Sequence, residues 1–291
     1  MNKYTHLDER AIDKLYDMPV ERIEYINTDW WIGYDEANGI LKELDDLINH
    51  PRNLRMPCRA LIGDSQNGKS TLLRRCFARN KVKYTEDEQI IFPAIIFETP
   101  SEASEGRLYS NMLNALGVAH REDAAPVRLL AKVIDRMTTL NVRLLMADEF
   151  HNMLQDTPRN QRQFLASLKS LLNMLKLPFV AAGTQDVARA LATDTQFVSR
   201  FEQLTLPRWG ANEATLRMIG TMERLLPLPE PSGLITQEKA VCIIGASGGT
   251  LGGVVDVVKK AGIAAILKGR NSIDLPILLE VIKKRNERKI K

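Results

Sequence analysis

The feature that most constrains this chain is a glycine-rich loop that fits the pattern G-x-x-x-x-G-K-[ST] at every fixed position: Gly63-Asp64-Ser65-Gln66-Asn67-Gly68-Lys69-Ser70. The apolar segment 58–63 precedes it and the helical segment 69–80 follows, so backbone N–H groups at a strand-to-helix turn can surround a phosphate. Lys69 supplies a charge for the β and γ phosphates, and the Ser70 hydroxyl is a ligand for Mg²⁺. With Thr71 included, the loop predicts a nucleotide site with ATP and Mg²⁺ as cofactors.

A second motif supplies the carboxylates that such a loop requires. The apolar segment 142–147 is followed directly by Asp148 and Glu149. At the end of a strand, Asp148 can reach the Mg²⁺ shell, and Glu149 is the natural general base for an attacking water. One predicted strand, 90–98, separates the two motifs, an order typical of P-loop ATPases with an added central strand. His151 follows closely, and the sequence leaves open whether it acts in the site or only packs.

Strands and helices alternate through the middle of the chain. Near-continuous apolar segments predict strands at 58–63, 90–98, 142–147, 178–183 and 203–207. Helical periodicity predicts helices between them at 69–80, 104–116, 125–139 and 160–175. Apolar strands that alternate with helices are typical of a parallel sheet covered on both faces. We therefore predict an α/β fold with a five-stranded parallel sheet flanked by helices.

The segments on both sides of this region predict helices alone. They are 8–18 and 35–49 before it, and 212–225, 236–246, 250–267 and 274–288 after it. The division that follows is an N-terminal helical extension at 1–50, a P-loop ATPase core at 51–208, and a small helical lid with a basic tail at 209–291.

Two further polar positions are predicted at the carboxyl edge of the sheet. Thr184, with Gln185 as second choice, either orients the attacking water or only caps the next helix. Arg200 precedes the last strand, where an arginine of an oligomeric ATPase reaches the γ-phosphate of the neighbouring subunit. A structural salt bridge is the other interpretation of Arg200, and Arg189 is the rival arginine.

Composition excludes several classes of protein. Three widely spaced cysteines, Cys58, Cys76 and Cys242, exclude a disulfide framework and have no metal-ligand spacing. No apolar run approaches the ~18 residues of a membrane span, and the polar N-terminus does not resemble a secretory signal, so we expect a cytoplasmic protein. The net charge is +4, but residues 283–291 hold six basic residues and one acidic residue, which leaves −1 for the first 282 residues.

Four blocks together resemble the TniB family of transposition ATPases, which belong to the AAA+ class and are similar to the phage Mu B protein. In chain order they are GDSQNGKST, LLMADEFHN, VAAGTQDVARAL and SRFEQLTLPRW, and the resemblance extends from about Tyr25 to about Gly262. It implies an ATP-dependent DNA-binding regulator of transposition that oligomerises as a ring or helical filament on duplex DNA. Such a protein selects the target and recruits the transposase, with a targeting protein of the same element as a further partner.

By position, the resemblance assigns Lys69, Ser70 and Thr71 to the nucleotide loop. It assigns Asp148 and Glu149 to the acidic pair. It makes Thr184 the first sensor and Arg200 the arginine finger. One departure is plain, because many AAA+ proteins carry a second-sensor arginine early in a lid helix, whereas residues 249–254 contain none. This departure implies slow hydrolysis and a larger role for the neighbouring subunit. We also expect hydrolysis to be stimulated by DNA.

The resemblance also suggests where DNA binds. In ATPases of this kind, DNA contacts loops after the second strand and nearby helices, here 99–107 and 117–121. Arg107, His120 and Arg121 are therefore candidate contacts to DNA phosphates, although each is equally explained as an ordinary solvated side chain. The basic tail is a further candidate for DNA or for the transposase.

Two other functions would use the same nucleotide residues. Another DNA-linked ATPase, such as a helicase loader, would differ only in its partner. An ATP-gated scaffold with vestigial hydrolysis belongs to a different class, against which Glu149 and Arg200 argue. The sequence contains no three-carboxylate nuclease pattern, so the transposase must be another chain.

Overall fold

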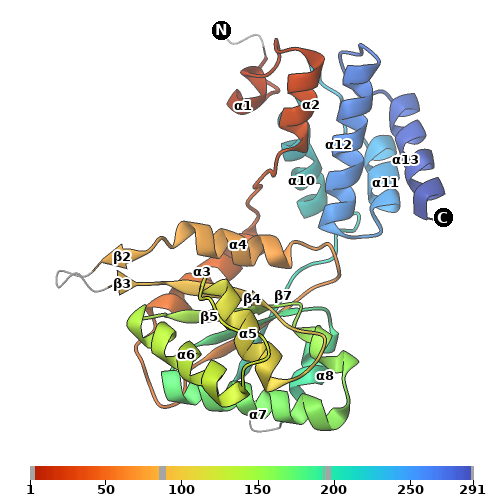
Figure 1. The fold of residues 1–291 in the computed structure, drawn as a ribbon. Helices are drawn as coiled ribbons and strands as arrows, with labels where there is room; N and C mark the ends of the chain where they lie inside the picture. The colour runs from red at the N-terminus through yellow and green to blue at the C-terminus, as the bar shows by residue number, and fades with distance from the viewer. Residues whose placement is uncertain (1–3, 85–89, 193, 195–197, 290–291) are drawn as a thin grey trace. The chain divides into compact units, whose positions relative to one another are not determined.

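The computed structural model describes residues 4–84, 90–192, 194 and 198–289 (Figure 1). Contacts group the chain into two compact units, one formed by Asp35–Pro207 and the other by Met1–Tyr34 together with Arg208–Lys291. Residues 1–34 therefore belong to a helical unit, residues 35–207 form the other unit, and residues 208–291 complete the helical unit. This grouping divides residues 1–50, predicted above as one N-terminal extension, between the two units.

The unit Asp35–Pro207 is built on a five-stranded parallel sheet with the order β4-β5-β6-β1-β7. The strands are β1 (Cys58–Ile62), β4 (Ala94–Glu98), β5 (Leu144–Asp148), β6 (Phe179–Gly183) and β7 (Phe201–Thr205). Strand β6 lies between the strands that carry the two motifs, β1 and β5. The predicted α/β class, the parallel sheet and its added central strand are confirmed.

Helices cover both faces of this sheet, which explains why the inner strands β5 and β6 are almost wholly apolar, whereas the edge strand β7 has exposed polar residues. They are α3 (Asp35–Asn49), α4 (Lys69–Arg79), α5 (Glu105–Ala115), α6 (Pro126–Thr139), α7 (Pro158–Leu175) and α8 (Asp186–Ala192). Figure 1 shows α3 and α4 together on one side of the sheet. Cys58, Ala60 and Ile62 belong to the core that also holds the buried faces of α5, α6 and α7. Leu61, between them, is fully buried and points to the opposite face, as the two-residue period of a strand requires.

The prediction of one strand over 90–98 is wrong, because Pro93 interrupts it. Residues Ile90–Ile91 form β3, which pairs antiparallel with β2 (Lys83–Tyr84) in a separate two-stranded sheet. Only from Ala94 does the chain join the main sheet as β4. Proline has no backbone N–H for a sheet ladder, so it separates the two strands.

The other unit consists of helices around their own core. They are α1 (Glu9–Ile12), α2 (Pro19–Asn27), α10 (Glu213–Arg224), α11 (Gln237–Ser247), α12 (Leu251–Leu267) and α13 (Leu275–Lys289). Ile26 of α2 and Trp209 are buried in this core with residues of α10, α12 and α13. None of the helices in the described part of the chain has the length and apolar character needed to span a bilayer.

The predicted helix over 8–18 is wrong in extent. Helix α1 ends at Ile12, and a further helix, α2, begins at Pro19. Proline favours the first turn of a helix because its missing N–H is not needed there. Glu21 also stabilises this start, because its carboxylate accepts a hydrogen bond from the Met18 backbone N–H at 3.0 Å.

The beginning of α12, where a second-sensor arginine is missing, is closely packed. Thr250 caps the helix, since its hydroxyl accepts a hydrogen bond from the Gly253 N–H at 3.1 Å. A Cβ at Gly253 would lie only 2.0 Å from the carbonyl oxygen of Ser247. The glycines of this turn therefore allow α12 to start against the end of α11.

We expect Gly253→Ala to destabilise the protein, because the added Cβ would force a backbone shift. Overpacking of this kind costs about 1–3 kcal/mol, and each kcal/mol lowers the Tm by roughly 2–4 °C. Gly245→Ala is the matched control, because a Cβ at this position of α11 meets open space and alanine favours a helix. Thermal unfolding measures both variants, and equal Tm values would contradict this account.

Candidate nucleotide-binding site

The carboxyl ends of β1, β4, β5 and β6 lie at one edge of the sheet, and the predicted loop and acidic pair begin there. The Gly63 N–H donates to the Gly183 carbonyl at 3.1 Å, and the Thr99 N–H donates to the Asp148 carbonyl at 2.9 Å. These bonds keep neighbouring strands in register up to their last residues, so the loops that leave them start side by side. In open parallel sheets this edge is where ligands bind.

The loop after β1 has a backbone suited to an anion. Gln66 and Gly68 have positive φ angles of 60° and 89°, a conformation that turns successive N–H groups toward one side. Helix α4 begins directly afterwards at Lys69, with Gly68 as its N-cap, so the free N–H groups of its first turn adjoin the loop. The buried Asn67 side chain donates to the Pro207 carbonyl at 2.8 Å and ties the loop to the segment after β7.

Lys69 lies inside this loop. Its side chain is 5% exposed, and Nζ donates to the carbonyl oxygens of Gly63 at 2.9 Å and Asp64 at 2.8 Å. Burial lowers the pKa of Lys69, while the negative charges of Glu149, Asp148 and Asp64 act in the opposite direction. The two carbonyls are neutral acceptors, and the charged oxygens of a phosphate are stronger ones. The ammonium is therefore available to a phosphate that enters the loop.

The acidic pair lies at the end of β5 in a constrained turn. Asp148 is the last residue of the strand, and its Oδ1 accepts a hydrogen bond from the Glu149 N–H at 2.9 Å. Glu149 has a φ of 50°, in the left-handed region that non-glycine residues rarely occupy. Such conformations cost about 1–3 kcal/mol and persist where the surrounding structure maintains them, often at functional sites. The turn begins the short helix η1 (Phe150–Gln155) and leaves the Glu149 side chain 40% exposed.

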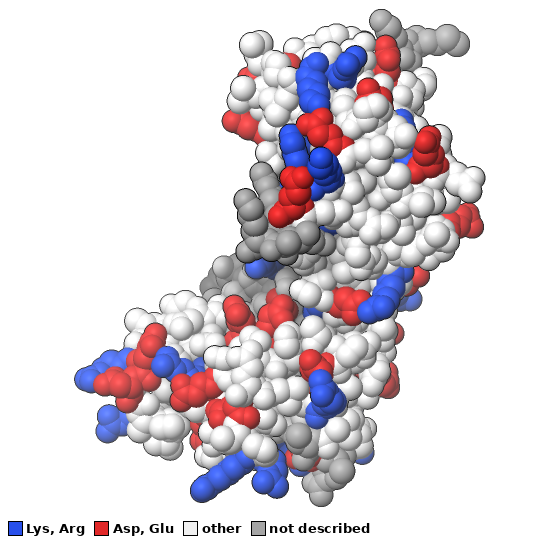
Figure 2. All heavy atoms as spheres, turned by 90° about the vertical axis from the view of Figure 1, so that its right-hand side faces the viewer, with Lys and Arg blue, Asp and Glu red and all other residues white. Residues whose placement is uncertain are grey.

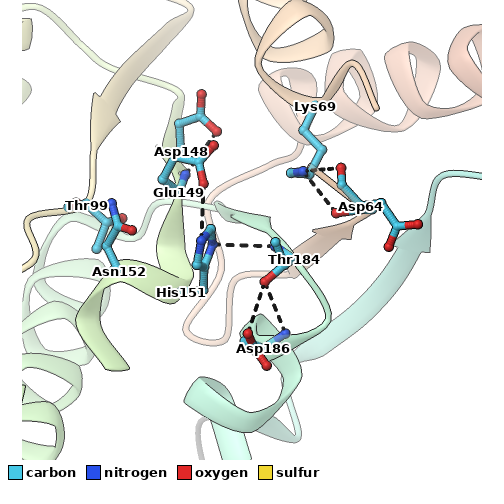
Figure 3. A network of polar contacts seen from close by, with 10 residues as sticks. Asp64, Lys69, Thr99, Asp148, Glu149, His151, Asn152, Thr184 and Asp186 are labelled. Carbon is cyan, nitrogen blue, oxygen red and sulfur yellow. Dashed lines mark hydrogen bonds and ion pairs between the residues drawn. The ribbon is translucent and has the colours of Figure 1, made fainter. Parts of the chain in front are cut away.

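The two sensor candidates differ in their surroundings. The Thr184 hydroxyl lies 3.4 Å from both the backbone N and the Oδ2 of Asp186, the first residue of α8. This geometry resembles a helix cap, while the backbone N–H of Thr184 points toward His151 in the network of Figure 3. Gln185 is exposed. The structure thus brings Thr184 to the same edge as the acidic pair.

The two arginines proposed as fingers have different partners. The Arg200 guanidinium donates to the side-chain oxygen of Asn173 in α7 at 2.8 Å. This partner is a neutral amide, whereas a structural salt bridge requires a carboxylate. Arg189 forms an ion pair with Asp186, three residues earlier in α8.

The three candidate DNA contacts each have protein partners. Arg107 pairs with Glu102 at 3.6 Å and Glu122 at 3.3 Å, and Arg121 pairs with its neighbour Asp123 at 2.8 Å. His120 is half-buried, with Nε2 2.6 Å from the Ser110 hydroxyl and Nδ1 2.9 Å from the Val118 carbonyl. On the face drawn in Figure 2, basic and acidic side chains of the described residues are interspersed.

Part of the basic tail also has a structural role. Arg285 is 9% exposed, forms an ion pair with Asp256 at 2.9 Å and donates to the Ala246 carbonyl. Lys284 pairs with Glu280 on the exposed side of α13 at 2.8 Å. Burial in the helical unit therefore removes at least Arg285 from the positive charge available to a partner.

Magnesium fits the predicted ligands only together with a nucleotide. Among the described residues, no group of three or more His, Cys, Asp or Glu side chains could hold a metal ion. Ser70 is the second residue of α4, and Asp148 ends β5. Mg²⁺ usually takes one or two protein ligands and completes its shell with phosphate oxygens and water, which agrees with this small set.

The sheet order, the loop after β1 and the acidic pair after β5 define the class of protein as a P-loop protein with the AAA+ fold. Solved structures agree on the fold. The Aeropyrum pernix ORC2 protein, solved with ADPNP and ADP, has a TM-score of 0.62 at 17% identity over 96% of this chain and 72% of that chain. The ORC1 protein of the same organism in complex with DNA has a TM-score of 0.63 at 13% identity over 90% and 69%. The Thermotoga maritima RuvB Holliday junction branch migration motor has a TM-score of 0.55 at 13% identity over 89% and 72%.

Sequence comparison gives the family. The profile described as "Bacterial TniB protein" matches residues 22–211, whereas no curated protein matches the chain. The chain belongs to the TniB family of transposition-associated AAA+ ATPases. The family predicted from the four sequence blocks is thereby confirmed.

Proposed function

We propose that the protein is an ATP-dependent regulator of DNA transposition that assembles on target duplex DNA and recruits the transposase. The observation that carries the proposal is the TniB match, which spans both the nucleotide loop and the acidic pair. The transposition role comes from the family. The geometry of the sheet edge supports the chemistry, which is hydrolysis of ATP to ADP and phosphate.

Each residue at this edge has a proposed role. Residues 63–71 bind the nucleotide, with Lys69 contacting the β and γ phosphates. Ser70 and Asp148 hold Mg²⁺, which when bound neutralises charge that develops on the phosphates. Glu149 accepts the proton of the attacking water. Thr184 orients that water through its hydroxyl.

Arg200 is the proposed finger for the nucleotide of a neighbouring subunit. Its hydrogen bond to the Asn173 amide can exchange for a phosphate, because the amide oxygen is neutral whereas a phosphate is negatively charged and can accept two parallel N–H bonds from a guanidinium. Arg189 is already neutralised by Asp186 within its own helix. Arg200 therefore remains the better choice.

DNA binding is proposed to depend on assembly. Arg107 and Arg121 already pair with carboxylates, and the first 282 residues have a net charge of −1. A single subunit then has little attraction for a phosphate backbone. Several weak contacts multiplied by oligomerisation give tight binding without a strongly basic monomer. Such binding is sequence-tolerant and falls steeply with salt.

The test combines imaging with phosphate release on the full chain. We expect rings or filaments with duplex DNA and a non-hydrolysable ATP analogue, and single subunits without nucleotide. Phosphate release from ATP should be slow and should rise when DNA is added. Absence of turnover with and without DNA would support the ATP-gated scaffold instead. Co-purification with a helicase rather than a transposase would support a helicase loader.

A further inference from the structure

His151 contacts two parts of the proposed catalytic edge. Its Nε2 lies 3.4 Å from Oε2 of Glu149. The backbone N–H of Thr184, at the end of β6, donates to its Nδ1 at 3.5 Å. Figure 3 shows the imidazole between the Glu149 side chain and the start of the loop after β6. The histidine therefore connects the proposed general base with the strand that carries the proposed sensor.

The two contacts together determine the tautomer. A backbone N–H can only donate a hydrogen bond, so Nδ1 must offer its lone pair to Thr184. In a neutral imidazole the proton is then on Nε2, which faces the carboxylate of Glu149. The contact with the general base therefore requires no positive charge on His151.

The backbone of β6 leaves room for the ring at one position. A Cβ at Gly183 would lie 2.8 Å from Nδ1 of His151 and 2.6 Å from a methyl group of Val187. Any side chain at this position would therefore displace the imidazole. The absence of a side chain at Gly183 allows the histidine to lie directly against the strand end.

His151 is not a residue that fills the core. Its side chain is 23% exposed and lines an open cavity of about 450 Å³ together with Leu154, Gln155, Asp186 and Arg189. The buried residues of the same turn are Phe150 and Met153. Replacement of the imidazole leaves no sealed void, so a purely structural role predicts little effect on any measurement.

We infer that His151 is a positioning residue that orients the carboxylate of Glu149 relative to the end of β6. The inference rests on the proposed ATPase function and deepens it. The left-handed backbone of Glu149 sets the direction of its side chain, and the contact between Nε2 of His151 and Oε2 of Glu149 at 3.4 Å restricts the carboxylate within that direction. Because the other ring nitrogen is bound at Thr184, the base and the proposed sensor move as one group.

The experiment compares His151→Leu, His151→Gln and a control histidine variant, His50→Leu, by kinetics of the full chain with DNA. His50 is half-buried, and its ring Nδ1 lies 2.8 Å from the carbonyl oxygen of its neighbour Pro51. We expect His151→Leu to lower kcat about ten- to hundredfold, as misplaced catalytic groups do, with KM and Tm unchanged. His151→Gln, whose amide can donate to Glu149, should recover most of this loss. In a Glu149→Gln background, His151→Leu should have no further effect.

Several results would overturn the inference. The first is that the wild type hydrolyses ATP and His151→Leu has the same kcat. Equal losses for His151→Leu and His151→Gln, or additive losses with Glu149→Gln, are the others. An inactive wild type would instead contradict the proposed function.

A second measurement tests the contact between His151 and Glu149 without relying on ATP hydrolysis. The chain has four histidines, so ¹⁵N-labelled imidazole resonances can be assigned with His151→Gln. We expect His151 to carry its proton on Nε2 and its Nε2 resonance to shift in Glu149→Gln. Detection of a neutral ring protonated on Nδ1 would overturn the inference even if the wild type is inactive.

Discussion

Replacing Glu149 with glutamine is expected to trap ATP-bound assemblies on DNA. The amide keeps the size of the side chain but cannot accept the proton of the attacking water. Hydrolysis should therefore fall by about 10²–10⁴-fold, the usual contribution of a general base. The nucleotide loop is untouched, so ATP binding and assembly should persist. Phosphate release measures the first effect, and the lifetime of the DNA complex in excess ATP measures the second.

The control for this variant is Glu213→Gln, which also removes one carboxylate. Glu213 is 83% exposed on α10 and lies 3.9 Å from Arg217, its neighbour one turn later. The Glu213→Gln variant should release phosphate, and should dissociate from DNA, at the wild-type rates. The proposal would be falsified if Glu149→Gln bound DNA no more stably than the wild type.

Replacing Arg200 with alanine is expected to abolish hydrolysis that depends on the assembly. An arginine that acts on a neighbouring subunit's γ-phosphate is worth about 10³–10⁵-fold in rate. Each Arg200→Ala subunit should still bind ATP, because its own loop is intact, but should assemble poorly. Nucleotide binding, oligomer size and phosphate release are measured on the same preparation.

A mixing experiment distinguishes action in trans from action within one subunit. Lys69→Ala subunits lack a working loop but keep Arg200, whereas Arg200→Ala subunits keep the loop. Mixed oligomers should recover part of the hydrolysis that neither variant shows alone. Recovery cannot occur if the arginine serves its own nucleotide.

Asn173→Ala tests the structural explanation of Arg200. This variant removes the amide that Arg200 contacts at 2.8 Å but leaves the guanidinium in place. If Arg200 only stabilises α7 through this bond, Asn173→Ala should cause the same loss as Arg200→Ala. Wild-type hydrolysis in Arg200→Ala would make Arg189 the better finger.

The errors of sequence reasoning follow from short-range effects of proline. Residues 90–98 form one apolar run, and Pro93 divides it into two strands that belong to different sheets. Pro19 likewise begins a helix, α2, that the pattern of residues 8–18 does not predict. Apolar periodicity predicts that a segment is ordered, but hydrogen bonding determines where each element stops.

The charge available to a partner is another property that the sequence alone does not determine. The sequence shows that the positive balance lies in residues 283–291. Only the structure shows that Arg285 is buried against Asp256, and that Arg107 pairs with two carboxylates. Net charge is a sum over residues, whereas attraction for DNA depends on which charges are already paired.

The sequence by itself determined the nucleotide loop, the acidic pair, the α/β class and the family. These depend on local features, since a glycine-rich turn and a carboxylate after an apolar strand are defined by consecutive residues. The tertiary structure decided what surrounds each of them. It placed β6 between β1 and β5, and so brought Thr184 and Gly183 to His151, 33 residues away from Thr184 in the chain. A parallel sheet brings together residues that are distant in sequence, and no local pattern specifies those contacts.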